Sequence, residues 1–201
     1  MKYILMLVLA VTTMMAQQGT QQGASVGDKA PEFRLKNIDG QYISLDTYKN
    51  SKGLVVVFTC NHCPYSVKYE DRIIALAAET AKLGYPLVAI NPNDPVKVPE
   101  DSYENMKVRA KEKGFTFPYI VDETQEVAKA YGAKRTPHVF ILSNTNASWT
   151  VQYIGAIDDN ANDAEKVESR FVLDAVRSLS SGSALAVTQT KAIGCTIKWK
   201  E

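Results

Sequence analysis

Residues 54–64 have the sequence LVVVFTCNHCP, and this stretch decides how the rest of the chain is interpreted. Its first five residues are all apolar, which is typical of a strand buried on both faces of a sheet. An amphipathic pattern of helical period then runs from Pro64 to Leu83 and ends before Gly84. The two cysteines, Cys60 and Cys63, therefore lie where a buried strand passes into a long helix.

Outside this stretch, the sequence predicts alternating strands and helices. Residues 33–45 alternate apolar and polar side chains around Asn37-Ile38-Asp39-Gly40, which favours an N-terminal β-hairpin. Further strands are expected at 86–90, 117–121, 137–142 and 151–157, and further helices at 100–113, 124–131 and 164–179. This order predicts an α/β fold with a central mixed sheet and helices on both faces.

The first residues have the pattern of a secretory signal. Met1-Lys2 gives a positive start, residues 3–11 are apolar, and the small Ala16 follows. An apolar run of this length is shorter than the roughly 20 residues of a transmembrane helix, although an uncleaved anchor stays open as an alternative. We therefore expect an exported protein of the bacterial periplasm or another extracytoplasmic compartment, without stable membrane insertion after signal cleavage.

The length of 201 residues favours one folded domain. We expect a signal peptide at 1–16, a flexible Gln/Gly-rich leader at 17–25, the domain at 26–181 and a C-terminal tail at 182–201. Cleavage of the signal removes one lysine from a chain of net charge +1, so the mature protein is neutral. A neutral chain has no electrostatic footprint for nucleic acid, and no such partner is expected.

The Cys-x-x-Cys spacing predicts a redox pair. Free N–H groups and the helix dipole favour an anion at the start of a helix, so Cys60 is expected there as the reactive thiolate. Cys63 is expected one turn into the helix, where it closes a small disulfide, and Pro64 is tolerated in a first turn. His62 either stabilises the thiolate as an imidazolium or is an exposed loop residue without effect.

Other uses of the two cysteines stay open. A structural disulfide would be a weak constraint, because stabilisation grows with the length of the loop that is closed. Zinc is disfavoured because no second Cys or His pair has ligand spacing. Copper is a further alternative, since thiolates are soft ligands and His138 would complete a set with Cys60 and Cys63.

Three segments carry a resemblance to a known family. They are residues 26–33 (VGDKAPEF), residues 55–63 and the Thr136-Pro137 dipeptide, which precedes a predicted strand. A proline as the first residue of a strand is permitted on its own account. Together these segments make residues 26–179 resemble the thioredoxin superfamily, in particular its peroxiredoxin-like branch of redoxin or AhpC/TSA proteins.

The resemblance implies a thioredoxin-like fold in which Cys60 and Cys63 are catalytic and no cofactor is needed. In such proteins the proline corresponding to Pro137 is cis and packs against the cysteine pair. Thr136 would then offer backbone groups to a substrate chain, and His138 would lie near Cys60.

Departures from the family patterns bear on function. Thioredoxins have Trp before the first cysteine, where this chain has Thr59. Peroxiredoxins carry Pro-x-x-x-Thr/Ser-x-x-Cys, and alignment of Cys63 with their peroxidatic cysteine puts Cys60 at the hydroxyl position and Val56 at the proline. The peroxide-binding hydroxyl is then missing. The buried strand also lacks an acid, which leaves Asp94 as the candidate proton acceptor.

Three functional hypotheses result. The first is thiol–disulfide exchange with protein disulfide or dithiol substrates and an upstream redox partner, in which Cys60 attacks and Cys63 resolves. The second is a thiol peroxidase that reduces peroxides with Cys63 as the peroxidatic residue. The third is a non-enzymatic copper carrier. Cys195, the remaining cysteine, is a free thiol, a resolving partner or an intermolecular link.

Overall fold

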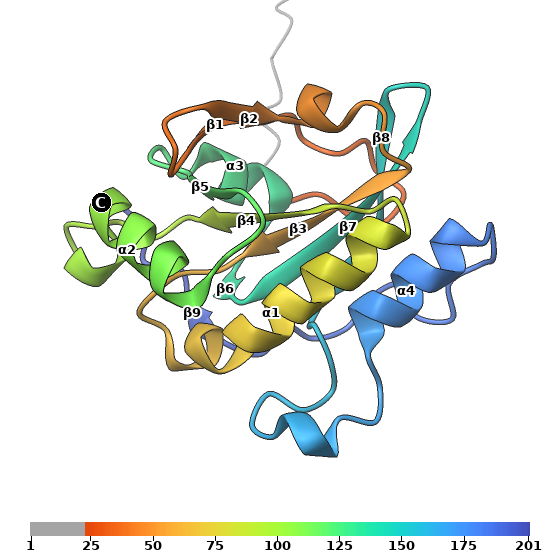
Figure 1. Ribbon diagram of the computed structural model, residues 1–201. Coiled ribbons are helices and arrows are strands. Elements are labelled where there is room, and N and C mark those ends of the chain that lie inside the picture. Colours follow the sequence, from red (N-terminus) through yellow and green to blue (C-terminus); the bar gives the residue numbers. More distant parts are fainter. Residues whose placement is uncertain (1–22) are drawn as a thin grey trace, which may run out of the picture.

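A seven-stranded mixed sheet forms the centre of the structure, a computed structural model that describes residues 23–201 (Figure 1). The expected signal peptide at 1–16 and most of the expected leader lie outside the described residues. Within residues 23–201, no helix combines the length and apolar character that crossing a membrane requires.

The strand order is β2-β1-β5-β4-β3-β7-β8. The parallel strands at the centre are β3 (Gly53–Phe58), β4 (Leu87–Asn91) and β5 (Tyr119–Val121). The antiparallel strands at the two edges are β1 (Arg34–Asn37), β2 (Tyr42–Ser44), β7 (His138–Thr145) and β8 (Ser148–Gly155). Every residue of β3 is buried, as its continuous apolar run predicts.

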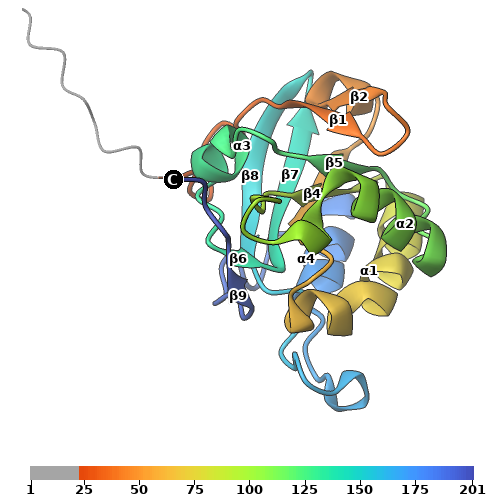
Figure 2. The same cartoon turned by 90° about the vertical axis from the view of Figure 1, so that its left-hand side faces the viewer.

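Helices cover both faces of the sheet (Figure 2). One face packs against α1 (Pro64–Lys82), α2 (Tyr103–Lys113) and α4 (Phe171–Ser180), and the other against α3 (Glu126–Tyr131) and the 3-10 turn η1 (Leu45–Tyr48). Strand β3 contributes side chains to the hydrophobic cores on both faces, since Val55 and Val57 point to the α1 side and Val56 to the α3 side. The predicted architecture is therefore confirmed.

The N-terminal hairpin is also confirmed. Strands β1 and β2 pair antiparallel, with Leu35 opposite Ile43. The Gly40 N–H donates to the Asn37 carbonyl oxygen at 2.8 Å, and Gly40 has a φ of 86°. A side chain at Gly40 would be strained in that conformation, which explains why the Asp-Gly pair marks this turn.

The helix expected at 164–179 is shorter than predicted. Helix α4 begins only at Phe171, and the 3-10 turn η3 (Ala164–Lys166) lies in the preceding loop. In this loop the Asp159 carboxylate accepts hydrogen bonds from the Glu168 and Ser169 N–H groups, at 3.1 and 2.9 Å. Short acidic side chains that bond to backbone compete with helix formation, which the apolar periodicity alone could not reveal.

The helix expected at 100–113 is divided. A 3-10 turn, η2 (Pro99–Asp101), comes first, and the Ser102 hydroxyl then caps α2 by accepting from the Asn105 N–H.

The last two strands, β7 and β8, are paired through a tight turn at Asn146 and Ala147, both with positive φ. Strand β7 therefore ends later, and β8 begins earlier, than the predicted ranges 137–142 and 151–157.

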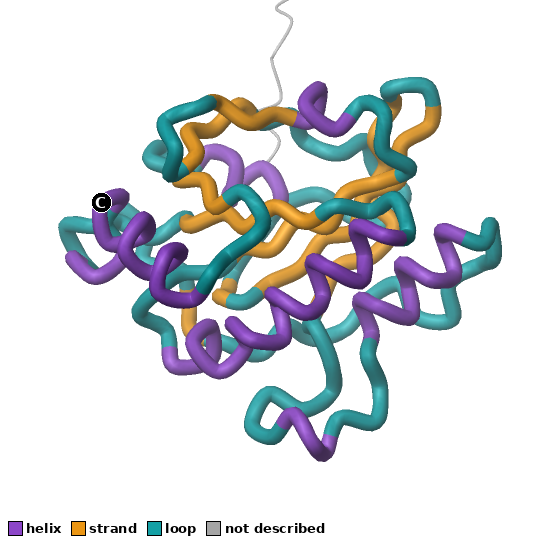
Figure 3. Tube along the Cα trace, in the orientation of Figure 1, coloured by secondary structure: helices purple, strands orange, loops and turns teal. Residues whose placement is uncertain are grey.

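The C-terminal segment lies against the domain, although its sequence predicted only a tail. Strand β9 (Cys195–Thr196) pairs antiparallel with β6 (Arg135–Thr136) in a second, two-stranded sheet (Figure 3). Ile197 is buried in the core on the α3 side. Beyond it, the Lys198 carbonyl oxygen accepts from the Asp94 N–H at 2.9 Å. This segment therefore reaches the carboxyl end of the parallel strands, where the two cysteines lie.

Candidate functional site

Helix α1 begins at Pro64, where its apolar periodicity predicted, but the two cysteines lie differently from the expectation. Pro64 is its first residue and Cys63 is its N-cap, so Cys63 lies at the helix N-terminus and Cys60 precedes the helix by a short loop. The expectation that Cys60 starts the helix and Cys63 lies one turn inside it is therefore wrong. The unpaired N–H groups and the dipole of this 19-residue helix act on Cys63.

Asp101 explains why the helix does not start earlier. Its Oδ1 accepts hydrogen bonds from the Asn61 N–H at 2.7 Å and from the His62 N–H at 3.0 Å. Its Oδ2 accepts from the Asn93 amide at 2.7 Å, and the residue is only 1% exposed. These bonds hold the two residues between the cysteines in a bend before the helix. The sequence analysis did not single out Asp101. Its position after a parallel strand, on the side where sites form in such sheets, was the only feature that could have indicated it.

Asp94, the acid favoured from the sequence, has a local role. Its Oδ1 accepts from the Val96 N–H at 3.1 Å and so closes a turn in its own loop. Among the described hydrogen bonds, none joins the Asp94 carboxylate to the Cys60–Cys63 loop. The carboxylate that binds this loop is that of Asp101.

Cys60 is buried among hydroxyl groups. Its Sγ lies 3.4 Å from Thr136 Oγ1 and 3.8 Å from Ser66 Oγ. Its hydrogen bond to Cys63, its burial and the charge of Asp101 together raise the pKa of Cys60 far above the ordinary value. Cys60 therefore stays a protonated thiol in the reduced protein.

Cys63 carries the thiolate of the pair. The hydrogen bond from Cys60 is the main reason that its pKa is lowered to about 4, and the Cys195 thiol and the Ser66 N–H act in the same direction against the effect of burial. When protonated, Cys63 donates to the Thr136 carbonyl oxygen at 3.2 Å. Ionisation gives up that one bond and gains several donors, which favours the anion.

The Thr136–Pro137 peptide bond is cis, as the resemblance implied. Thr136 is fully buried and contacts both sulfurs, Cys60 through its hydroxyl and Cys63 through its carbonyl oxygen. The loop before β7 therefore packs directly on the cysteine pair.

Thr59 and His62 contribute less than the sequence suggested. The Thr59 N–H donates to the Ile90 carbonyl oxygen at 2.9 Å, which extends the β3–β4 pairing to the edge of the site. The His62 side chain is 53% exposed, and its Nδ1 lies 4.0 Å from Glu100 Oε1. In the described residues no hydrogen bond links it to a sulfur, which favours the interpretation of His62 as an exposed loop residue.

His138 points away from the cysteines. Its ring packs on Phe140 with 4.8 Å between centroids, and its Nδ1 accepts from the Lys134 N–H at 3.4 Å. Burial, with the charges of Lys134 and Arg135, lowers the pKa of His138 to about 4. Within residues 23–201, no three Cys, His, Asp or Glu side chains are arranged to hold a metal ion. The copper hypothesis therefore lacks its ligand set.

A third thiol reaches the site from the C-terminal segment. Cys195 lies opposite Thr136 in the β6–β9 pairing, and its thiol and N–H help to lower the pKa of Cys63, whose thiol bonds to the Thr136 carbonyl oxygen. Burial and the neighbouring Cys63 raise the pKa of Cys195 to about 11. All three cysteines of the chain are free thiols. No local pattern predicts this approach, since only tertiary pairing brings Cys195 to Thr136.

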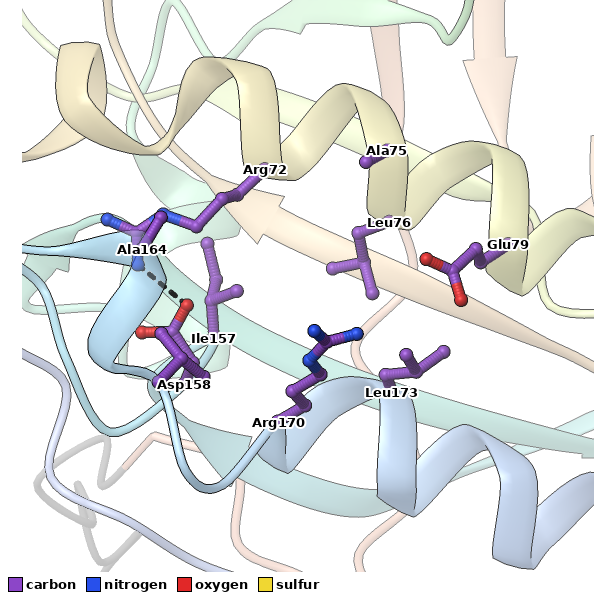
Figure 4. A pocket seen from close by; sticks show the side chains of 10 residues that line it. Arg72, Ala75, Leu76, Glu79, Ile157, Asp158, Ala164, Arg170 and Leu173 are labelled. Carbon is purple, nitrogen blue, oxygen red and sulfur yellow. Dashed lines mark hydrogen bonds and ion pairs between the residues drawn. The ribbon is translucent and has the colours of Figure 1, made fainter.

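A separate pocket of about 240 Å³ lies between α1 and α4 (Figure 4). Apolar side chains such as Leu76 and Leu173 line it together with Arg170 and with Arg72, which donates to Asp158 at 2.7 Å. Among the described residues that line it there is no cysteine. The thiol cluster is therefore a buried group of side chains at the start of α1, separate from this pocket.

Comparison with known proteins places the chain among thiol-dependent proteins. The sequence pattern of the AhpC/TSA family matches residues 26–154. The thiol-disulfide oxidoreductase ResA of Geobacillus thermodenitrificans is 29% identical over 145 residues, 69% of this chain and 77% of that relative.

Solved structures share the fold. An uncharacterized conserved protein from Geobacillus kaustophilus is 40% identical, with a TM-score of 0.81 over 88% of this chain and 93% of that one. The peroxidoxin BcpB of Mycobacterium tuberculosis is 18% identical, with a TM-score of 0.57 over 78% of this chain and 96% of that one. The thioredoxin-like fold implied by the sequence is thereby confirmed.

Proposed function

The chain belongs to the AhpC/TSA family, and on this premise we propose that it is a thiol–disulfide oxidoreductase that works through Cys63 and Cys60. The observation that carries the proposal is the position of Cys63 at the N-cap of α1, with the Cys60 thiol and Thr136 in contact with it. The similarity to a named thiol-disulfide oxidoreductase supports the same activity.

In this proposal Cys63 is the attacking residue, which reverses the roles that the spacing alone suggested. Its thiolate attacks a disulfide of a partner protein, forms a mixed disulfide and releases the first partner thiolate. The hydrogen bond to the Cys63 thiolate, which is the main cause of the raised Cys60 pKa, is lost in the mixed disulfide. Cys60 can then ionise more easily.

Cys60 completes the exchange. It attacks Cys63 Sγ, the Cys60–Cys63 bond forms, and the second partner sulfur leaves as a thiolate. The Thr136 and Ser66 hydroxyls, which accept from the Cys60 thiol, can turn to donate to its thiolate. An upstream dithiol would return the pair to the reduced form.

We also propose that the protein acts outside the cytoplasm on protein disulfides or dithiols. The signal-like pattern at 1–16 supports export, and disulfide chemistry between proteins is common in oxidising compartments. The neutral charge of the mature chain agrees with protein partners more than with nucleic acid.

An insulin-reduction assay with a dithiol as electron donor tests the exchange activity. The wild-type protein should accelerate reduction, and Cys63→Ser should reduce the rate to that of the dithiol alone. His62→Ala serves as the control from the same loop and should keep the activity. A Cys63→Ser protein as active as the wild type would contradict the proposal.

Peroxide reduction is a second candidate, favoured by one observation. Cys63-Pro64 occupies the helix start with a lowered Cys63 pKa, and a thiolate there is the species that peroxides oxidise. The test is stopped-flow peroxide consumption with detection of sulfenic acid in Cys60→Ser/Cys195→Ser, which lacks both thiols that could condense with it. A reaction no faster than that of an ordinary thiol would exclude this activity.

A further inference from the structure

The C-terminal segment occupies the backbone edge of Thr136. Strand β9 pairs antiparallel with β6, so Cys195 lies opposite Thr136 and Thr196 opposite Arg135. Under the family resemblance, Thr136 was the residue expected to offer its backbone to a substrate chain. In this structure a segment of the same chain, with a cysteine in it, lies at that edge.

Several contacts hold this segment firmly in place. The Arg135 guanidinium donates to the Gly194 carbonyl oxygen at 2.8 Å, and the Ile197 N–H donates to the Lys134 carbonyl oxygen at 3.3 Å. A Cβ at Gly194 would lie only 2.2 Å from the Thr136 carbonyl oxygen. The segment can approach the site this closely only because residue 194 is a glycine.

The direction of the Cys195 side chain follows from the strand geometry. Successive side chains of a strand point to opposite sides, so Cys195 and Thr196 face different ways. Thr196 is exposed, whereas Cys195, the strand partner of Thr136, has its side chain on the same side as the Thr136 hydroxyl that contacts Cys60. Thr136 thus brings three sulfurs together, since it contacts Cys60 and Cys63 directly and is the strand partner of Cys195.

We propose that Cys195 is a third redox-active thiol, which moves the disulfide from Cys60–Cys63 to Cys63–Cys195. This inference rests on the proposed function of the Cys60–Cys63 pair. The Cys195 thiol loses its proton and attacks Cys63 Sγ, the Cys63–Cys195 bond forms, and the Cys60–Cys63 bond breaks. Cys60 leaves as a thiolate and takes up a proton. One disulfide and one thiol are present before and after, so no external oxidant or reductant is needed.

The three sulfurs differ in exposure, and this difference indicates what the step achieves. Cys60 and Cys63 are each only 3% exposed, whereas Cys195 is partly exposed. A partner thiolate can therefore reach the sulfur of Cys195 before it can reach the buried pair. The disulfide moves from the interior to the edge of the protein, where exchange with a protein partner takes place.

Disulfide mapping in Cys60→Ser tests the proposal. The purified protein is oxidised with diamide, remaining thiols are alkylated, and the peptides are identified by mass spectrometry without reduction. We expect the linked Cys63–Cys195 peptides and loss of alkylation at both positions. The matched control is Cys60→Ser/Cys195→Ser/Thr196→Cys, which keeps a thiol in the same segment but turns it outward, and it should give no intramolecular link.

Two outcomes would overturn the inference. One is full alkylation of Cys195 in oxidised Cys60→Ser, and the other is equal linking in the Thr196→Cys control, which would indicate only a mobile segment. The wild-type protein, treated in the same way, reports on the proposed function separately. If it forms Cys60–Cys63 and reduces insulin while Cys63–Cys195 never appears, only the inference fails. If no Cys60–Cys63 disulfide forms, the proposed function itself fails.

Discussion

Thr136 and Cys195 face each other across a two-stranded antiparallel sheet, directly beside the Thr136–Pro137 bond on which both Cys60 and Cys63 pack. The site is therefore assembled from three distant parts of the chain: the start of α1, the residues before β7 and the C-terminal strand. The two cysteines of the motif differ in their surroundings, and the C-terminal strand controls access to them.

Mixed-disulfide trapping distinguishes the roles of the two motif cysteines. With Cys63 as the attacking thiolate and Cys60 as the resolving thiol, and with Cys195→Ser as the common background so that Cys195 cannot resolve in its place, Cys60→Ser should accumulate mixed disulfides with an oxidised protein substrate, whereas Cys63→Ser should form none. Non-reducing electrophoresis measures both. Accumulation in Cys63→Ser alone would restore the assignment of Cys60 as the nucleophile.

The pH dependence of the thiolate follows from the lowered Cys63 pKa. Since Cys63 is ionised at neutral pH, the ultraviolet absorbance of its thiolate should change little as the pH is first lowered from neutral. It should fall only as the pH decreases through about 4. In Cys60→Ala the midpoint should rise by about one unit or more, because the strongest donor is removed. A wild-type midpoint near the ordinary value of 9.0 would contradict the account.

Asp101→Asn should destabilise the protein by about 1.5–3 kcal/mol, since the carboxylate holds the loop between the cysteines by charged hydrogen bonds. The amide nitrogen that the substitution introduces would also face the Asn93 amide nitrogen, and two donors cannot form a hydrogen bond. Asp94→Asn is the control, because an Asn can still accept from the Val96 N–H, and its cost should stay within about 0.5 kcal/mol. Urea unfolding of the reduced proteins measures both, and equal stabilities of the two variants would refute the role of Asp101.

Much of the fold could be predicted because it depends on local patterns. The apolar run of β3 predicted a central buried strand, and the Asp39-Gly40 turn predicted the first hairpin. The cysteine pair at the strand-to-helix junction was equally visible in the sequence. These features need only periodicity, turn chemistry and spacing.

The parts that escaped prediction depend on contacts between distant residues. The loop between the cysteines is held by Asp101, which lies about 40 residues away and accepts hydrogen bonds from two N–H groups of the loop. Strand β9 has two residues and no periodic pattern, so its pairing with β6 has no local signal. The loop before α4 is held by Asp159, whose bonds replace helical ones.

The β7–β8 turn offers a test of backbone conformation. Ala147 has a φ of 62°, a region that is costly for a residue with a Cβ. Ala147→Gly should therefore raise the free energy of unfolding by about 1 kcal/mol. Ala78→Gly, on the exposed side of α1, should lower it by about the same amount. Thermal unfolding of both variants checks the opposite signs, and destabilisation by Ala147→Gly would contradict the turn geometry.

Gly194→Ala should loosen the C-terminal strand, because the added Cβ would lie 2.2 Å from the Thr136 carbonyl oxygen. Displacement of β9 should raise the exposure of Cys63 and accelerate its alkylation by iodoacetamide, by about tenfold if the substitution weakens the β6–β9 pairing by about 1.4 kcal/mol. Thr196→Ala, an exposed position on the same strand, should leave the rate unchanged. An unchanged rate in Gly194→Ala would show that β9 does not limit access.

A redox titration distinguishes a redox-active Cys60–Cys63 pair from two unreactive thiols. The mature protein is equilibrated in graded redox buffers, its thiols are trapped, and the disulfide between Cys60 and Cys63 is quantified by mass spectrometry. If Cys60 and Cys63 are the redox pair, the wild type should show a single two-electron couple that disappears in Cys63→Ser. A wild-type protein whose Cys60 and Cys63 remain thiols at every potential would contradict it.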